Sequence, residues 1–215
     1  MSKLDDIDKL SFSVKLGQAV HEELKSELPK HETKLAQTMT DINLNAVISG
    51  TQTVVRDVLG KPNETVTLDV SADKRNQWMR EKRTDVQIVP PQHAPTDLQI
   101  SMAGQFLVNM ESELGGKKAR NDDLSKLTEH KGAPTASVMA WREQSFKHID
   151  RGISHLKEES KGREEPYVAV VQHWPHNKPI SETTPIVAVV NKGEVVWDSR
   201  NPTAGSGTED GWTLV

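Results

Sequence analysis

Two histidines near the C-terminus have the residue type and the spacing to do chemistry. His173 and His176 follow an apolar run that begins at Val168, and a tryptophan and a proline separate them. Two imidazoles this close can bind a metal ion, although a zinc site needs three or four ligands. Further ligands would come from the C-terminal acids Asp198, Glu209 and Asp210. We favour the alternative, in which the histidines are the polar exit of a strand, because no third ligand has a recognisable spacing.

A basic segment around a tryptophan is the second candidate. Between Asp73 and Arg83, five basic and two acidic side chains flank Trp78. An aromatic ring among cations can stack on a base while the cations bind phosphates. The residues that would do so are Lys74, Arg75, Trp78, Arg80, Lys82 and Arg83. The alternative, which we prefer because the net charge is −4, is a solvated segment anchored by its tryptophan.

Nucleophilic and phosphate-loop chemistry find no support in the sequence. The chain has no cysteine and no Gly-x-Ser-x-Gly motif, and the glycine-rich stretch Thr203 to Gly211 lacks the Gly-Lys-Ser/Thr ending of a phosphate loop. Paired carboxylates occur only in strongly polar surroundings, where they stay ionised. We therefore predict no catalytic residue and no cofactor.

The N-terminal part of the sequence predicts mainly helices. Alternation from Leu10 to Leu16 predicts a short extended piece, followed by a helix that stops before Pro29. A second helical pattern starts at His31 and changes face at Gly50, which predicts a break there and an end at Gly60. Strands are expected at 65–70 and 86–89.

Two amphipathic helices are predicted in the central part of the chain. Apolar residues recur at helical spacing between Thr96 and Leu114, and again between Pro134 and Leu156. The stretch from Lys157 to Glu165 has no apolar residue and predicts an exposed boundary.

The last fifty residues or so change to runs of β-branched residues. Three runs separated by turn signals predict a small antiparallel unit, with a two-residue hairpin turn at Lys192-Gly193. That turn would pair Val189 with Val196 and Ala188 with Trp197. Both faces of the hairpin would then be apolar and need a cover. The narrow N-terminal stripes match a sheet poorly, so we predict an interface with another chain, formed by Val187, Val189, Val196 and Trp197.

Together these patterns predict an α+β fold. We expect a helical region at 1–62, a central region at 63–160 with amphipathic helices and one or two strands, and an antiparallel β unit at 165–215. The N-terminus lacks the basic start and apolar run of a signal peptide, and no apolar stretch approaches the roughly 18 residues of a membrane span. We expect no membrane contact, and a location in the cytoplasm or in an assembled particle.

The function that fits these expectations is non-catalytic. Amphipathic helices, long polar connections and five tryptophans suit a structural or adaptor protein that assembles with itself or with other protein subunits. A bacteriophage virion or tail-associated component is one such protein. Two alternatives stay open: a metal-dependent enzyme that uses His173, His176 and the C-terminal acids, and a nucleic-acid-binding accessory protein that uses residues 74–83.

Overall fold

The computed structural model describes residues 8–70, 81, 83–88, 96–114, 117–129 and 134–203. Its helices are α1 (Lys9–Glu27), α2 (Ala36–Asp57), α4 (Lys117–Glu129) and α5 (Phe146–Ser160), with short 3₁₀ turns η2 (Leu28–Lys30) and η3 (Ile180–Glu182). Its strands are β1 (Thr67–Val70), β2 (Gln87–Ile88), β3 (Leu98–Met102), β4 (Gln105–Glu113), β5 (Ala136–Glu143), β6 (Tyr167–His173), β7 (Thr184–Asn191) and β8 (Glu194–Asp198).

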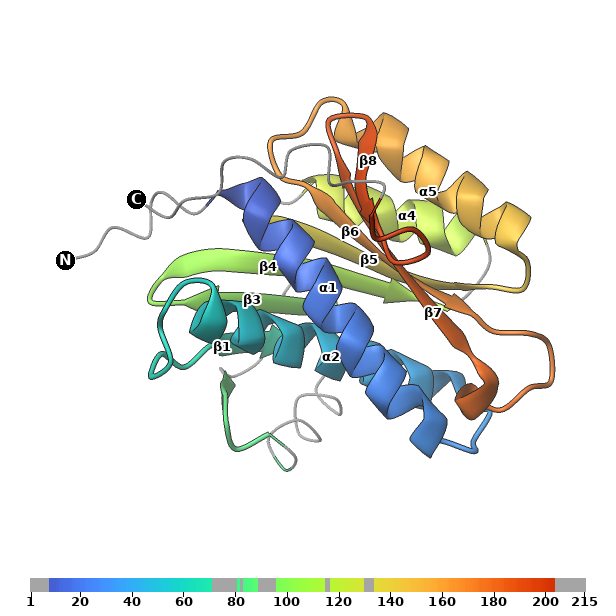
Figure 1. Ribbon diagram of the computed structural model, residues 1–215, viewed down its shortest axis with the longest axis horizontal. Coiled ribbons are helices and arrows are strands. Elements are labelled where there is room, and N and C mark those ends of the chain that lie inside the picture. The colour runs from blue at the N-terminus through green and yellow to red at the C-terminus, as the bar shows by residue number, and fades with distance from the viewer. Residues whose placement is uncertain are drawn as a thin grey trace.

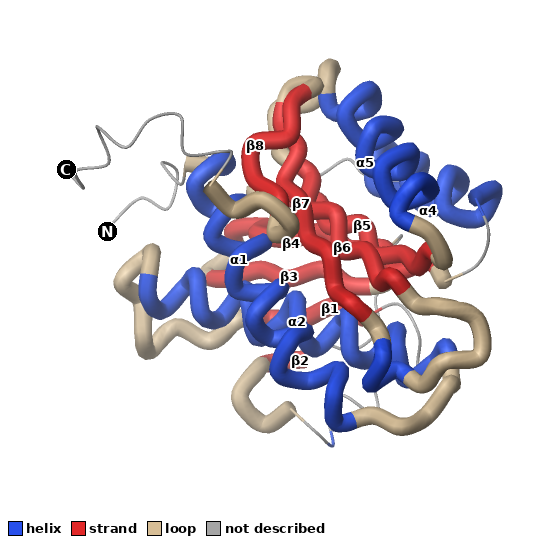
Figure 2. The backbone as a smooth tube through the Cα atoms, turned by 45° about the vertical axis from the view of Figure 1, so that its right-hand side comes forward, coloured by secondary structure: helices blue, strands red, loops and turns tan. Residues whose placement is uncertain are grey.

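All eight strands form one mixed sheet in the order β2-β1-β3-β4-β5-β6-β7-β8 (Figure 1). Helices α1 and α2 pack on one face and α4 and α5 on the other, so the sheet is the middle of three layers (Figure 2). The α+β class is confirmed. The central region holds five strands rather than one or two, and the C-terminal strands continue the same sheet because β6 pairs in parallel with β5.

The two N-terminal helices pack against each other and then on the sheet. Helix α1 begins at Lys9 because Asp8 caps it, accepting hydrogen bonds from the backbone N–H groups of Leu10 and Ser11. The extended piece predicted at 10–16 is therefore wrong. Helix α2 also runs through Gly50 without a break, and the two helices approach each other closely at this glycine: a Cβ there would lie 2.9 Å from Val20 Cγ2.

The helix predicted between Thr96 and Leu114 is instead a hairpin of β3 and β4. Its turn is Ala103-Gly104, where both residues have positive φ, as a tight hairpin requires. Leu98, Met102 and Met110 face the α1/α2 core. Apolar residues spaced two and four apart satisfy a strand as well as a helical stripe, so the pattern alone did not separate the two.

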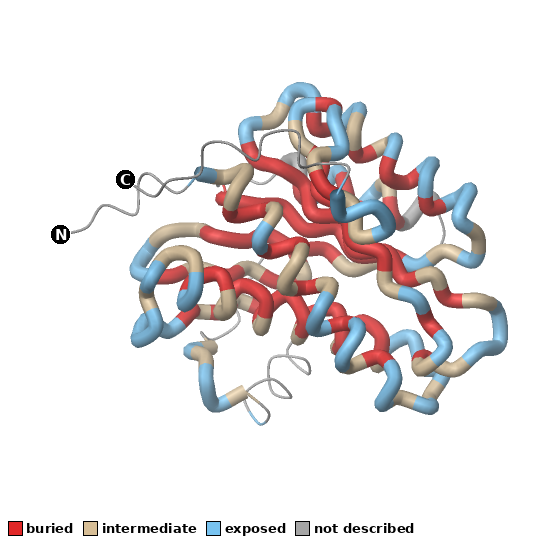
Figure 3. The backbone as a smooth tube through the Cα atoms, viewed as in Figure 1, coloured by how far each residue is buried: buried red, intermediate tan, exposed pale blue. Residues whose placement is uncertain are grey.

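The predicted helix from Pro134 to Leu156 is wrong in its first half. Strand β5 occupies 136–143, and Ser145 then caps α5 through a hydrogen bond from His148 N–H. Strand β5 is buried on both faces, so its apolar residues run nearly without interruption. In Figure 3 the buried segments follow the strands in the middle of the molecule.

The segment predicted to be a boundary begins inside α5. Its Ser160 is fully buried and accepts a hydrogen bond of 2.8 Å from the backbone N–H of Gly193 in the β7–β8 turn. That turn is the predicted two-residue one, because Lys192 and Gly193 both have positive φ. The connection between α5 and β6 therefore begins only after Ser160.

The predicted strand register of the β7–β8 hairpin is wrong beyond the pair of Val190 with Val195. Val190 faces Val195 as expected, but a β-bulge then makes Val196 the extra residue, and Val189 pairs with Trp197. The bulge moves Trp197 to the face that carries Val189, where α1 covers both. Gly17 of α1 permits this, since a Cβ there would lie 2.9 Å from Val189 Cγ2.

Candidate functional site

A row of polar side chains crosses five strands on the sheet face that also carries α4 and α5. The strand register places these residues side by side: Asp69, Gln99, Asn109, Ser137 and Tyr167. Thr96 extends the row, because its hydroxyl lies 2.5 Å from Asn109 Oδ1. Asn109, Ser137 and Tyr167 are fully buried. A sheet interior normally buries apolar side chains, so a buried polar row on this face is unusual.

Two carboxyl groups meet next to this row. Glu111, on β4, is 2% exposed, and its carboxyl group is hydrogen-bonded to that of Asp97, which precedes β3. Asp97 also accepts a hydrogen bond of 2.9 Å from the backbone N–H of Ser112. Burial, followed by the nearby charge of Asp97, raises the pKa of Glu111 to about 9. At neutral pH Glu111 therefore holds a proton in this structure.

Helix α4 brings further charged groups over the carboxyl pair. Lys126 pairs with Asp123 one turn earlier and lies 4.0 Å from Glu111 Oε1. The hydrogen bond to Asp123 raises the pKa of Lys126, so this side chain is a stable cation. Arg120, one turn before Asp123, pairs with Glu143 at the end of β5 at 2.6 Å and lies over the Trp141 ring. The surroundings therefore combine two paired cations with a closely spaced carboxyl pair.

Buried polar atoms without a hydrogen-bond partner gather at this site. Among the described residues they include Asn109 Nδ2, Glu111 Oε1 and Ser137 Oγ. Leaving a buried polar atom unpaired costs about 1–3 kcal/mol. Their concentration around Glu111 marks a place where a bound group would supply the missing interactions.

The chemistry of the donors selects the kind of group. Carboxylate, amide and hydroxyl oxygens suit hard cations such as Mg²⁺, Mn²⁺ and Ca²⁺. A divalent cation beside Glu111 would replace its proton and remove the repulsion with Asp97. Within the described residues, no three side chains of His, Cys, Asp and Glu converge as a complete metal site. Mg²⁺ is commonly held by one or two carboxylates, with water and substrate phosphate as its other ligands.

Within the described residues, Asp198 does not lie beside His173. His173 ends β6 opposite Thr184, while Asp198 lies opposite Ala188, four residues further along β7, and pairs with Arg200. Trp174 closes the turn by donating from Nε1 to Lys178 O at 2.8 Å. Glu209 and Asp210 lie outside the described residues.

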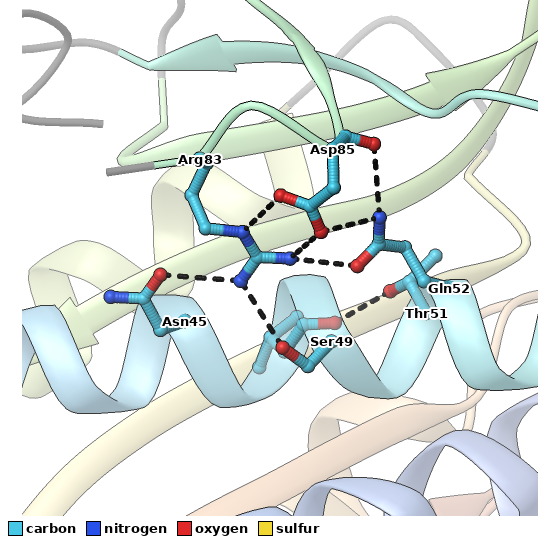
Figure 4. Close-up of polar contacts among 7 residues, drawn as sticks. Asn45, Ser49, Thr51, Gln52, Arg83 and Asp85 are labelled. Atoms are coloured by element: carbon cyan, nitrogen blue, oxygen red, sulfur yellow. Dashed lines mark hydrogen bonds and ion pairs between the residues drawn. The ribbon is translucent and has the colours of Figure 1, made fainter. Parts of the chain in front are cut away.

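Of the predicted basic segment, only Arg83 lies within the described part of the chain; Lys74, Arg75, Trp78, Arg80 and Lys82 do not. The Arg83 side chain is 13% exposed and donates to Asn45, Ser49 and Gln52 of α2 and to Asp85 (Figure 4). The Arg83 guanidinium is therefore engaged within the protein, by side chains of α2 and by Asp85.

The predicted interface residues are covered within the chain. Val187 and Val189 are fully buried, Trp197 is 8% exposed, and Val196 is partly buried against the same core. Helix α1 supplies the cover that we expected from a second chain. The argument for an oligomer therefore no longer holds, and an oligomer itself remains an untested proposal.

Glu111 and Asp97 were missed because the hairpin was read as a helix. One signal was present: Asn109, Glu111 and Glu113 are polar at every second position, which is the period of a strand face.

Within the described residues, no helix is both long enough and apolar enough to cross a membrane. Comparison of the chain with protein-family models, curated proteins and solved structures found no match.

Proposed function

We propose that this protein binds a divalent cation of the Mg²⁺ class at Asp97 and Glu111 and uses it to hydrolyse a phosphodiester. The observation that carries the proposal is the buried carboxyl of Glu111, which shares a hydrogen bond with a second carboxyl while its Oε1 has no hydrogen-bond partner among the described residues. Perturbed carboxyl groups in such surroundings are typical of catalytic sites.

The reaction class follows from the coordination positions of the cation that the two carboxylates would leave open. A hard cation held by two carboxylates has open positions, which substrate phosphate and water fill. A cation bound there would supply polarisation of the phosphoryl oxygen and activation of the water. The water oxygen would bond to phosphorus and the bond from phosphorus to the leaving oxygen would break, with one water proton passing to the leaving oxygen and the other to bulk water. A phosphate monoester and an alcohol result.

The side chains of the protein have separate parts in this scheme. Asp97 and Glu111 would hold the cation, and Glu111 would give up its proton to do so. Lys126, 4.0 Å from Glu111 Oε1, is placed to bind a phosphate oxygen and stabilise the charge that develops there.

The test is hydrolysis of a generic diester, bis(p-nitrophenyl) phosphate, with Mg²⁺ or Mn²⁺. Wild-type protein should release nitrophenol, chelator should stop it, and Asp97→Asn and Glu111→Gln should each lower the rate by at least about a hundredfold. Glu158→Gln, an exposed carboxylate on α5, is the matched control and should keep full activity. Metal-dependent activity that survives in both site variants would refute the assignment, as would a wild type without activity on this diester or on DNA or RNA.

Assembly with other chains, expected from the sequence, remains a proposal of a different class. Its support is compositional, and sedimentation of the purified protein alone and with partners tests it.

A further inference from the structure

Helix α4 covers the part of the sheet that carries Glu111. It packs on β4 and β5, whereas α5, on the same face, packs mainly on β6 and β7 (Figure 2). Lys126 of α4 lies 4.0 Å from Glu111 Oε1, and Arg120, six residues earlier, lies over the Trp141 ring of β5. Glu111 is 2% exposed beneath this cover. Its carboxyl group is therefore closed off from ions in solution while α4 is in place.

Few apolar side chains attach α4 to the sheet. Among its described side chains, Leu124 and Leu127 are the buried apolar ones. Helix α5 buries three in the same cluster: Ile149, Ile153 and Leu156. Because burial of apolar area is the main term that stabilises a packed helix, α4 is the less firmly attached of the two.

The rest of the α4 surface that faces the sheet is polar and incompletely paired. Arg120 and Asp123 are buried. Arg120 Nε and Asn121 Oδ1 are buried without a hydrogen-bond partner among the described residues, and water would satisfy both if the helix moved away. Packing of α4 therefore carries a desolvation penalty, which lowers the cost of opening.

One ion pair connects α4 to the end of β5. Arg120 Nη1 lies 2.6 Å from Glu143 Oε1, and the two side chains are 10% and 19% exposed. A pair this sheltered is screened less than a surface pair, and loss of one partner leaves the other charge uncompensated. The Lys126–Asp123 pair lies within α4 and does not attach the helix to the sheet.

We propose that α4 is a movable cover of the carboxyl pair, held closed by the Arg120–Glu143 ion pair, and that it opens while the rest of the fold stays intact. Local opening of a weakly attached element costs less free energy than global unfolding, and the lids of active sites are such elements. The open state exposes Glu111 and its neighbour on β5, Met139. That a cation and a phosphodiester enter there rests on the proposed function, whereas the opening itself does not.

Thiol labelling measures the opening, because the chain has no cysteine of its own. Met139→Cys places a probe in the cluster beneath α4, Ala188→Cys places one beneath α5, and Val138→Cys places one on the opposite face, in the core of α1 and α2. All three positions are buried. Reagent concentrations at which the rate is proportional to concentration make the rate report the open fraction. Met139→Cys should react at least roughly a hundredfold faster than its stability to urea permits for global unfolding, and the other two only at the rate of global unfolding.

The ion pair is tested by adding Glu143→Gln to each probe. The labelling rate of Met139→Cys should rise roughly tenfold or more, and the rates of the other two probes should not change. Glu158→Gln, which breaks an exposed ion pair on α5, is the matched control and should alter none of the three rates.

The proposal is overturned if Met139→Cys reacts no faster than Ala188→Cys or than global unfolding permits. It is also overturned if Glu143→Gln accelerates all three probes equally or none of them. Fast labelling of Met139→Cys without diester hydrolysis refutes the proposed function and leaves the cover standing. Hydrolysis in a protein whose Met139→Cys variant labels only by global unfolding does the reverse.

Discussion

The carboxyl group of Glu111 is hydrogen-bonded to the carboxyl group of Asp97 across the β3–β4 hairpin, although both side chains are acids. One of them must hold a proton for this bond to exist, and burial assigns it to Glu111, whose pKa is about 9. The protein thus keeps a protonated acid where an unfolded chain would have an ionised one.

Glu111→Gln should stabilise the protein at high pH. Glu111 has an unfolded pKa near 4.5 and a folded pKa of about 9. Below pH 4.5 both states hold the proton. Above it the unfolded state releases its proton first, so Glu111 lowers stability by about 1.4 kcal/mol per pH unit until about pH 9. Urea denaturation should find the variant and wild type similar at pH 4, and the variant more stable by at least about 2 kcal/mol at pH 8. If the free energy of unfolding changed with pH in the same way for wild type and variant, the proton on buried Glu111 would be contradicted.

Cation binding should release that proton. Calcium, added as a non-reactive stand-in, should raise the melting temperature of wild type more at pH 8 than at pH 6, because binding to the folded state is coupled to deprotonation. Calorimetry in buffers of different ionisation enthalpy should give about one proton released. Asp97→Asn should abolish both effects. A shift independent of pH would mean that calcium binds elsewhere.

Gly50→Ala should destabilise the protein by about 1–3 kcal/mol. The added methyl would lie 2.9 Å from Val20 Cγ2 and 3.2 Å from the Val20 backbone nitrogen, which cannot rotate away. Gly162→Ala is the control, since its methyl would meet no described atom within 4 Å. Chemical denaturation of both variants checks this, and equal effects would argue against the close helix approach.

Arg83→Glu should destabilise the protein by about 2 kcal/mol. It places a carboxylate beside Asp85 and removes donors to three side chains of α2, although exposure of Asp85 limits the loss. Arg56→Glu changes an exposed arginine on α2 that pairs with Asp57, and should have a smaller effect. Thermal melts compare the two. If both reversals behave alike, the network in Figure 4 is not structural.

Val189→Lys should prevent folding rather than dissociate an assembly. Its side chain is fully buried against α1, where a lysine charge would have no solvent. Val195→Lys, on the exposed side of the same hairpin, should fold normally. Circular dichroism and sedimentation together decide the matter: a folded Val189→Lys monomer from an oligomeric wild type would restore the interface hypothesis.

The sequence alone determined features that depend on near neighbours. The Lys192-Gly193 turn, the strands near 67–70 and 87–88, and the helix end before Gly60 are all present. A turn needs particular residues at adjacent positions, and a short alternating run between turn residues has few other structures open to it.

Only the tertiary structure decided which residues form the site and which form the core. Strand β5 is buried on both faces, so its pattern did not distinguish it from a helix. The sequence pattern predicted a helix break at Gly50, whereas the structure uses this glycine for close packing against α1. One bulge at Val196 places Trp197 on the face opposite to the predicted one. The pairing of Asp97 with Glu111 required the hairpin, its register and the cover of α4. The pKa of an acid and its affinity for a cation depend on burial and on distances between side chains, which the order of residues along a chain does not contain.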